Sequence, residues 1–273
     1  MSQDAQWEST NWAPEDRAAL QNAANLLESR SFAMTIAQKV GMPVESLLRM
    51  LPAGAQRSIG TAVNRALEQC LHAALHFNQT GKVTAFSNRR HTVATGLTGA
   101  VGGFFGLPGL VVELPLTTTL MLHSIAEIAR CHGEDLTNPE TALACLQVLA
   151  LGPEGATNGA LESAYYATRA ALAQVTREAA SYVAQKGMVK EGAPVLVSFL
   201  GKIAARFGIE VSEKAAAQLI PVAGAAGGLA LNVLFTMHFQ RLAEGHFTVR
   251  RLERKYGPEA VRAHYAALSA TAV

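Results

Sequence analysis

Glu113 has the residue type and surroundings that most suggest chemistry, because it is the only charged residue between positions 93 and 122. A carboxylate among apolar neighbours is costly to bury unless a cation or hydrogen-bond donor accompanies it. The candidate partners are Arg89, Arg90, His91 and His123. Such a group could act as a general acid or base, with His123 or His91 beside it, as a metal ligand or as a lipid-headgroup contact. The alternative interpretation is an exposed loop acid that assists the start of a helix after Pro115.

Other polar residues lie at spacings that can bind a metal. His123 and Glu127 lie one helical turn apart, and so do His72 and His76. Neither pair is followed by a third or fourth ligand at a suitable spacing, so we predict no metal centre. The sequence also lacks a phosphate-binding loop, a dinucleotide fingerprint and a nucleophile elbow. We therefore predict no cofactor. His238, between Asn232 and Gln240, is expected to be a hydrogen-bonded core histidine.

The elements that position these residues are helices. Pro14 is followed by two acids, and Asn138 precedes Pro139, as is typical of helix starts. Gly133 and Gly257 are predicted to end helices, and a helix from residue 194 is expected to end at Gly208. No segment has the alternation and turn residues of a strand pair. We predict an all-α multi-helix bundle, with an N-terminal helical extension at residues 1–44 and a helical domain at residues 45–273.

Two uncharged, glycine-rich runs are predicted to form the centre of this bundle, at residues 93–122 and 215–237. The word GAxGG occurs in both runs, at residues 99–103 and 224–228. Glycine inside a helix costs about 1 kcal/mol relative to alanine, so its use favours helices that approach closely. The glycines predicted to pack helices together or against a membrane are Gly96, Gly99, Gly102, Gly103, Gly106, Gly109, Gly224, Gly227 and Gly228.

The lengths of these runs also indicate whether either could cross a membrane. Residues 215–237 would suffice to cross a bilayer as one helix. Glu113 and Pro115 interrupt the other run, so two buried or re-entrant helices fit better than two spans.

Composition and charge indicate where the protein works. Apolar residues make up 49% and charged residues 16% of the chain, and the mean hydropathy is +0.16. A net charge of +2 is too small to indicate a nucleic-acid partner. The polar, acidic N-terminus lacks the features of a secretion signal, and the three cysteines are expected to be buried free thiols. We expect a cytoplasmic protein associated with the cytoplasmic face of the membrane.

Basic residues adjoin both uncharged runs. Arg89 and Arg90 precede the first, and Arg250, Arg251 and Arg254 follow the second on a segment that also contains His246 and Lys255. Cations beside an apolar run favour a membrane surface that carries anionic lipid. A solvated helix face is the alternative.

Three segments of the sequence resemble the EcsC family: TGLTGAVGGFFGLPGLVVELP, its continuation through SIAEIARCHGEDL, and the closing GAAGG with RRLERKYG. The resemblance covers most of residues 45–260. Members usually have aspartate and Tyr-Gly where this chain has Glu113 and His132-Gly133. The family is named after a gene neighbour of an ABC transporter, and its activity is poorly defined. The resemblance implies a helical, membrane-associated bacterial protein and implies no reaction.

Together these observations predict a non-enzymatic helical protein that binds lipid or a membrane partner and is linked to a transporter or to regulated proteolysis. The alternative is a soluble hydrolase whose active site surrounds Glu113 and a nearby histidine. A soluble module that binds a transporter or a protease regulator is a third possibility. The small-molecule substrate, if there is one, is unknown.

Overall fold

The computed structural model describes residues 12–29, 32–80, 88–152, 163–186, 193–219 and 224–271. Over these residues the chain is helical and contains no strand, which confirms the predicted all-α fold. The elements are α2 (Pro14–Leu27), α3 (Phe32–Val40), α4 (Val44–Arg49), α5 (Ala55–Thr80), α6 (Asn88–Cys131), α7 (Pro139–Gln147), η1 (Val148–Ala150), α8 (Ala164–Lys186), α9 (Pro194–Gln218), α10 (Gly224–Tyr256) and α11 (Pro258–Thr271).

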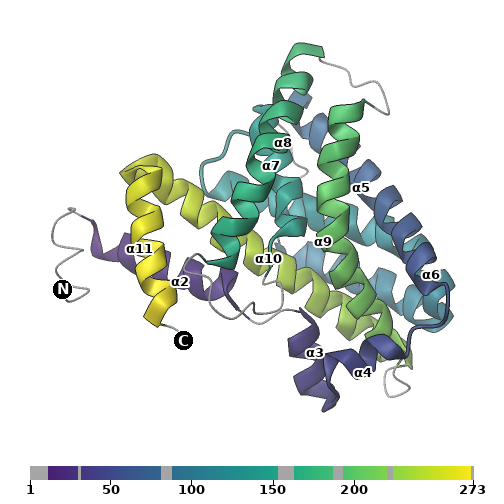
Figure 1. Ribbon diagram of the computed structural model, residues 1–273. Helices are drawn as coiled ribbons and strands as arrows, with labels where there is room; N and C mark the ends of the chain where they lie inside the picture. The colour runs from purple at the N-terminus through teal and green to yellow at the C-terminus, as the bar shows by residue number, and fades with distance from the viewer. Residues whose placement is uncertain are drawn as a thin grey trace.

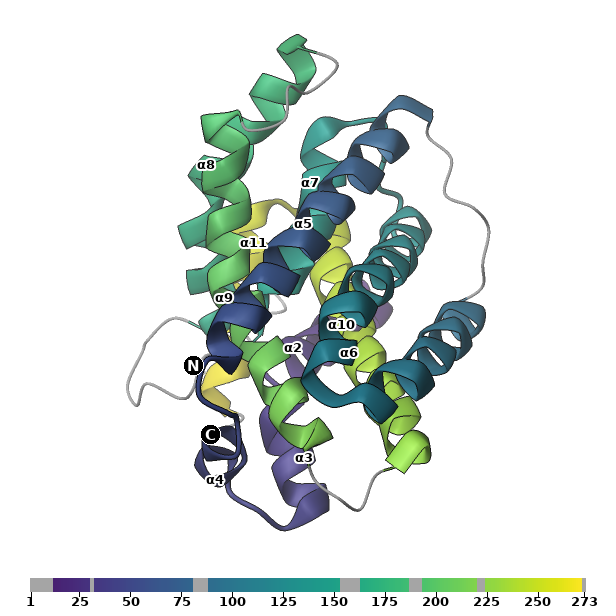
Figure 2. The ribbon, with the colours of Figure 1, turned by 90° about the vertical axis from the view of Figure 1, so that its right-hand side faces the viewer.

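Helix α10 crosses the molecule diagonally and lies at its centre (Figure 1). It packs against α6 and α2, while α6 also packs against α5, and α8 lies beside α9 (Figures 1 and 2). The first glycine-rich run lies in α6 and the second ends in α10, and these two helices pack against each other. Gly109 is half-buried and Gly228 is buried. The side-chain surroundings of the other seven glycines predicted to pack lie outside the described residues.

The core between α9 and α10 is built from phenylalanines. Phe207 on α9 and Phe235 and Phe239 on α10 are fully buried. The rings of Phe235 and Phe239 are 5.1 Å apart, and those of Phe207 and Phe239 are 5.6 Å apart, with their planes steeply inclined. Such edge-to-face contacts add to the stability gained from burial. They hold α9 and α10 in a fixed register, which matters for the polar residues that the two helices carry.

The local signals for helix ends are confirmed. Pro14 is the first residue of α2, and the Asn138 side chain accepts a hydrogen bond from the Glu140 backbone N–H at the start of α7. Gly133 follows α6 with φ of +78°, and Gly257 separates α10 from α11 with φ of +89°. Both values lie in the left-handed region, which glycine adopts without steric cost.

Two expected interruptions are wrong. Glu113 and Pro115 lie within α6, which continues to Cys131, and α9 continues through Gly208 to Gln218. Helix α9 continues because Ile203, Phe207 and Val211 are all fully buried at helical spacing. Burial of such side chains, at roughly 1.5–3 kcal/mol each, outweighs the cost of one glycine.

The uncharged run at residues 215–237 is not one helix. Its first residues end α9 at Gln218, and α10 begins at Gly224, so the expected single element of spanning length is wrong. Among the helices of the described residues, none combines the length and the apolar character that a membrane crossing requires.

Helix α6 is bent, and its two segments meet close to the start of α10 (Figure 2). Pro108 and Pro115 both lie within this helix. Each proline removes a backbone N–H from the helical ladder and crowds the preceding turn, which is the usual cause of a kink.

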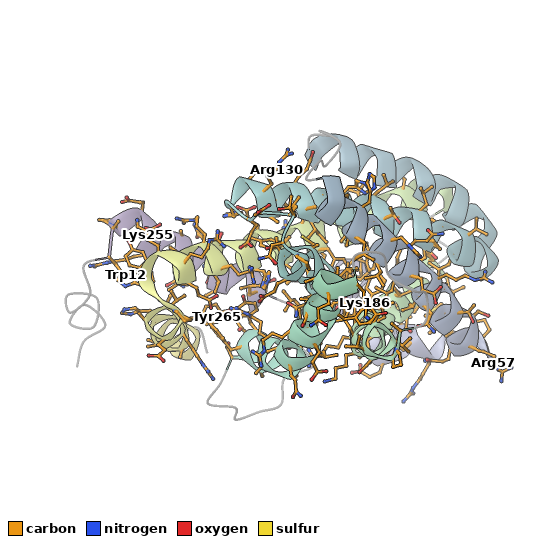
Figure 3. All side chains as sticks on the ribbon, turned by 90° about the horizontal axis from the view of Figure 1, so that it is seen from above. Trp12, Arg57, Arg130, Lys186, Lys255 and Tyr265 are labelled. Atoms are coloured by element: carbon orange, nitrogen blue, oxygen red, sulfur yellow. The ribbon has the colours of Figure 1, made fainter. Side chains whose placement is uncertain are left out.

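Helix α2 belongs to the predicted extension at residues 1–44, and it packs on α10 and α11. Trp12, just before α2, stacks on the Tyr256 ring with centroids 4.1 Å apart. Figure 3 shows Trp12 and Lys255 at the same end of the molecule. The domain boundary at residue 44 stays a prediction.

Candidate functional site

Glu113 forms a buried ion pair with Lys214. Glu113 lies on α6 and Lys214 on α9, and their side chains are 3% and 0% exposed. The Lys214 Nζ donates a hydrogen bond of 2.8 Å to Glu113 Oε1, which also accepts a 3.5 Å hydrogen bond from Thr117. Among the described residues, Glu113 Oε2 is buried without a hydrogen-bond partner. The interpretation of Glu113 as an exposed loop acid is therefore wrong.

Among the described residues the partner of Glu113 is Lys214, which the sequence did not suggest. His123 has its Nδ1 2.8 Å from the Thr119 carbonyl oxygen, and its ring packs edge-on against Phe77. The side chains of Arg89, Arg90 and His91 lie outside the described residues, although their backbones belong to α6. A signal for the true partner was present, since Lys214 is the last charge before the second uncharged run.

Lys214 also lies beside an aromatic ring. Its Nζ lies 5.0 Å from the centre of the Phe235 ring. Burial lowers the pKa of Lys214, and the attraction of Glu113 opposes this shift. Because the two side chains join neighbouring helices in the interior, the pair fixes α9 against α6.

The arginines predicted to form a basic surface on α10 bind carboxylates of the same chain. Arg250 donates to Glu134 at 2.9 Å, and Arg254 bonds the same carboxylate. Arg251 donates to Asp16 at 2.9 Å, and Lys255 bonds Asp16 at 2.6 Å. The Glu134 and Asp16 side chains are only 3% and 4% exposed. These pairs tie α10 to the turn after α6 and to α2.

The cations set the ionisation of these two carboxyls. Burial acts to raise the pKa of Asp16, but hydrogen bonds from Lys255 and Arg251 outweigh it and the pKa is lowered. Burial also acts to raise the pKa of Glu134, but hydrogen bonds and charge from Arg250 and Arg254 outweigh it, so the pKa of Glu134 is lowered. Both carboxyls are therefore charged near neutral pH.

His246 is not part of the basic face. Its side chain is buried, and its Nδ1 lies 2.9 Å from the Tyr165 hydroxyl. Burial, reinforced by Arg169 and Arg250, lowers the pKa of His246 well below its ordinary value, so the ring is neutral. Arg169 also donates two hydrogen bonds, of 2.7 and 3.0 Å, to Glu253. This network borders a cavity of about 270 Å³ between α8 and α11.

A larger cavity lies between α2 and α10 and measures about 510 Å³. His132, just after α6, and Glu244 of α10 both line it, with the His132 Nε2 at 3.0 Å from the Glu244 carboxylate. The hydrogen bond from His132 lowers the pKa of Glu244. The sequence gave no indication of this pairing, because the two residues are 112 positions apart.

His238 lies on α10 opposite Glu210 of α9, with their side chains 10% and 12% exposed. Its Nε2 is 3.9 Å from Glu210 Oε1, beyond hydrogen-bond distance, and has no hydrogen-bond partner in the described part of the chain. His238 is therefore nearly buried, as expected of a core histidine, but its Nε2 lacks the expected hydrogen bond. Burial, with Glu213 nearby, raises the pKa of Glu210 to about 8. Burial, with Arg241 nearby, lowers the pKa of His238 to about 4. Near neutral pH both side chains are uncharged.

Metal-binding and thiol chemistry have little support in the described part of the chain. There, no group of three or more histidine, cysteine, aspartate or glutamate side chains is arranged to hold a metal ion. Cys70 and Cys145 are buried free thiols as predicted, whereas Cys131 is exposed at the end of α6. Burial raises the pKa of Cys70 to about 12 and that of Cys145 equally, so neither is a reactive thiolate.

Comparison with known proteins gives one match. Residues 17–252, most of the chain, match the model of the EcsC protein family. No match was found among curated proteins or among solved structures. The match agrees with the resemblance carried by the two glycine-rich segments and the closing basic segment.

Proposed function

We propose that this chain, which belongs to the EcsC protein family, docks on the surface of a membrane through an apolar face of α6. Two exposed side chains on that helix carry the proposal. Val112 is 79% exposed and Leu116 is 52% exposed. They lie four positions apart, so they project from the same face of the helix. We call these two residues the α6 apolar face.

The position of this face distinguishes it from scattered apolar residues, which are normal on protein surfaces. Val112 is the last residue of the charge-free part of α6 that starts at residue 93, and Leu116 lies one turn further on. Leu229, 39% exposed, lies in the first turns of α10, a helix that packs against α6. Moving a side chain of this size from water into the apolar part of a lipid layer contributes roughly 1.5–3 kcal/mol.

Basic residues add attraction to anionic lipid in this proposal. Arg89 and Arg90 lie in the first turn of α6, before the charge-free run. Each cation near an anionic membrane surface contributes about 1 kcal/mol. Arg250, Arg251 and Arg254 are already paired with Asp16 and Glu134, so they serve mainly to hold α10 in place.

Vesicle sedimentation tests this function. The wild type should pellet with vesicles of phosphatidylcholine and anionic phosphatidylglycerol, and the Val112→Asp/Leu116→Asp variant should bind about tenfold more weakly or worse. The matched control is Val197→Asp/Ile209→Asp, which changes residues of α9 that are 57% and 50% exposed. The control should pellet like the wild type. A wild type that stays in the supernatant, or an α6 variant that pellets as well as the control, would refute the proposal.

The role of the two arginines is tested separately with lipid charge. Arg89→Gln/Arg90→Gln should weaken binding to anionic vesicles by about 2 kcal/mol and leave binding to neutral vesicles unchanged. Equal loss on both kinds of vesicle would show that these residues act by some route other than charge.

The alternative of a hydrolase centred on Glu113 has less support. A catalytic carboxylate must reach its substrate, whereas this side chain is 3% exposed and bonded to Lys214. His123 bonds the backbone of its own helix. A link to a transporter or to regulated proteolysis stays a prediction from the family resemblance.

A further inference from the structure

A small cavity between α3 and α10 has the features of a ligand site. Its volume is about 250 Å³. Phe32 of α3 and Leu234 and Met237 of α10 supply its apolar walls. Ser29, after α2, and Thr35 bring hydroxyl groups to the same cavity. Phe32 is held in place by an edge-to-face contact with Phe235, with ring centroids 5.1 Å apart, so this wall is fixed in shape.

Arg241 brings a positive charge to the cavity. Arg241 lines it and is exposed, and among the residues that the structure describes it has no carboxylate partner. His238 also lines it and is uncharged near neutral pH, because burial lowers its pKa to about 4. The Glu210 carboxyl behind His238 is protonated there, because its pKa is raised to about 8. Among the described residues that line the cavity there is no carboxylate to neutralise the Arg241 charge.

His238 adds an unsatisfied polar group to the wall of the cavity. Its side chain is 10% exposed, and its Nε2, 3.9 Å from Glu210 Oε1, has no hydrogen-bond partner among the residues that the structure describes. Buried polar groups in proteins are nearly always hydrogen-bonded, and exceptions tend to mark functional positions. Here the exception belongs to a ring that lines the cavity.

We propose that this cavity binds a small amphipathic anion, namely a medium-chain carboxylate. Its hydrocarbon chain would pack against Phe32, Leu234 and Met237, and its carboxylate would accept hydrogen bonds from the Arg241 guanidinium. Guanidinium and carboxylate have matching planar geometries, which favours this pairing. At about 30 Å³ per non-hydrogen atom, a 250 Å³ cavity holds roughly eight such atoms. Octanoate therefore fits with its chain inside and its carboxylate at the rim.

Calorimetric titration of the full chain with octanoate tests this inference. A ligand of this size is expected to bind with a Kd of about 10 µM to 1 mM, so protein must be used at high concentration. The wild type should show one saturable site. Arg241→Gln, a change at an exposed position, should weaken binding about tenfold or more. Leu234→Phe should abolish it by filling the cavity, provided that thermal unfolding shows a folded protein.

The matched control is Arg57→Gln, which removes another exposed arginine, at the surface of α5 (Figure 3). It should bind octanoate like the wild type. Two further ligands test the apolar walls and Arg241 separately. Octanol, which has the chain without the carboxylate, should bind the wild type and Arg241→Gln equally weakly. Acetate, which has the carboxylate without the chain, should fail to displace octanoate. Absence of saturable octanoate binding, equal binding by Arg241→Gln, or displacement by acetate would each overturn the proposal. None of these outcomes depends on membrane docking, since no vesicle is present.

Discussion

Replacing Lys214 by methionine would leave Glu113 charged and alone in the interior between α6 and α9. The two side chains are 0% and 3% exposed, and the Nζ–Oε1 distance is 2.8 Å. Methionine has nearly the length of lysine and can pack against Phe235, which already lies beside the Lys214 Nζ. The variant therefore removes the charge while keeping most of the packing.

The expected loss follows from the geometry. At 2.8 Å and an effective dielectric constant of about 20, the attraction between the two charges is roughly 6 kcal/mol. The cost of taking both charges out of water cancels much of this gain, so the intact pair contributes little net stability. Removing only one partner leaves the other charge buried, which typically costs about 3–5 kcal/mol. That is a large share of the 5–15 kcal/mol that holds a typical domain folded.

Urea denaturation followed by far-UV circular dichroism measures the free energy of unfolding. Lys214→Met should lose about 3–5 kcal/mol, and the double variant Glu113→Leu/Lys214→Met should recover most of this loss. Lys202→Met is the matched control, because Lys202 is exposed on the same helix. It should change stability by less than about 0.5 kcal/mol. A Lys214→Met protein within about 1 kcal/mol of the wild type, or a double variant as unstable as the single one, would refute this reasoning.

Two further predictions concern other parts of the fold. In the folded protein the Glu210 and His238 pair holds one proton from about pH 4 to about pH 8. In the unfolded chain these side chains have their ordinary pKa values of 4.5 and 6.5, so they hold no proton above pH 6.5. Stability should therefore fall by about 2 kcal/mol as pH rises from 6.5 to 8, and Glu210→Gln should remove this loss; urea titrations that show an equal loss in the variant would contradict it. A Cβ at Gly245 would lie 2.8 Å from Leu27 Cγ and 3.1 Å from the Ala23 oxygen. Gly245→Ala should thus lower the free energy of unfolding by about 1–3 kcal/mol, whereas Gly208→Ala, with nothing within 4 Å, should raise it by about 0.5–1 kcal/mol.

The sequence predicted the features that depend on local interactions. The helix start at Asn138 and the stops at Gly133 and Gly257 were correct, because capping and left-handed backbone geometry are properties of neighbouring residues. The continuation of α9 through Gly208 was missed. Its cause is tertiary, since Phe207 and Val211 are buried against other helices, and no local signal reports such burial.

The chemistry of the polar residues was harder to predict. The sequence left open whether Glu113 is buried or exposed, because the answer depends on its partner. That partner, Lys214, lies 101 positions away in the sequence. The same holds for the Asp16 carboxylate, which binds Arg251 and Lys255 of α10. A single sequence records the types of these residues but not their pairing. The basic segment on α10 therefore suggested a surface, whereas its cations secure the fold.

Cell fractionation with the untagged protein tests membrane docking most directly. We predict that the wild type and the Val197→Asp/Ile209→Asp control sediment with the membranes, and that the Val112→Asp/Leu116→Asp variant moves to the high-speed supernatant as a folded protein. A wild type found entirely in the supernatant, or an α6 variant that remains with the membranes as fully as the wild type, would contradict docking through the α6 apolar face.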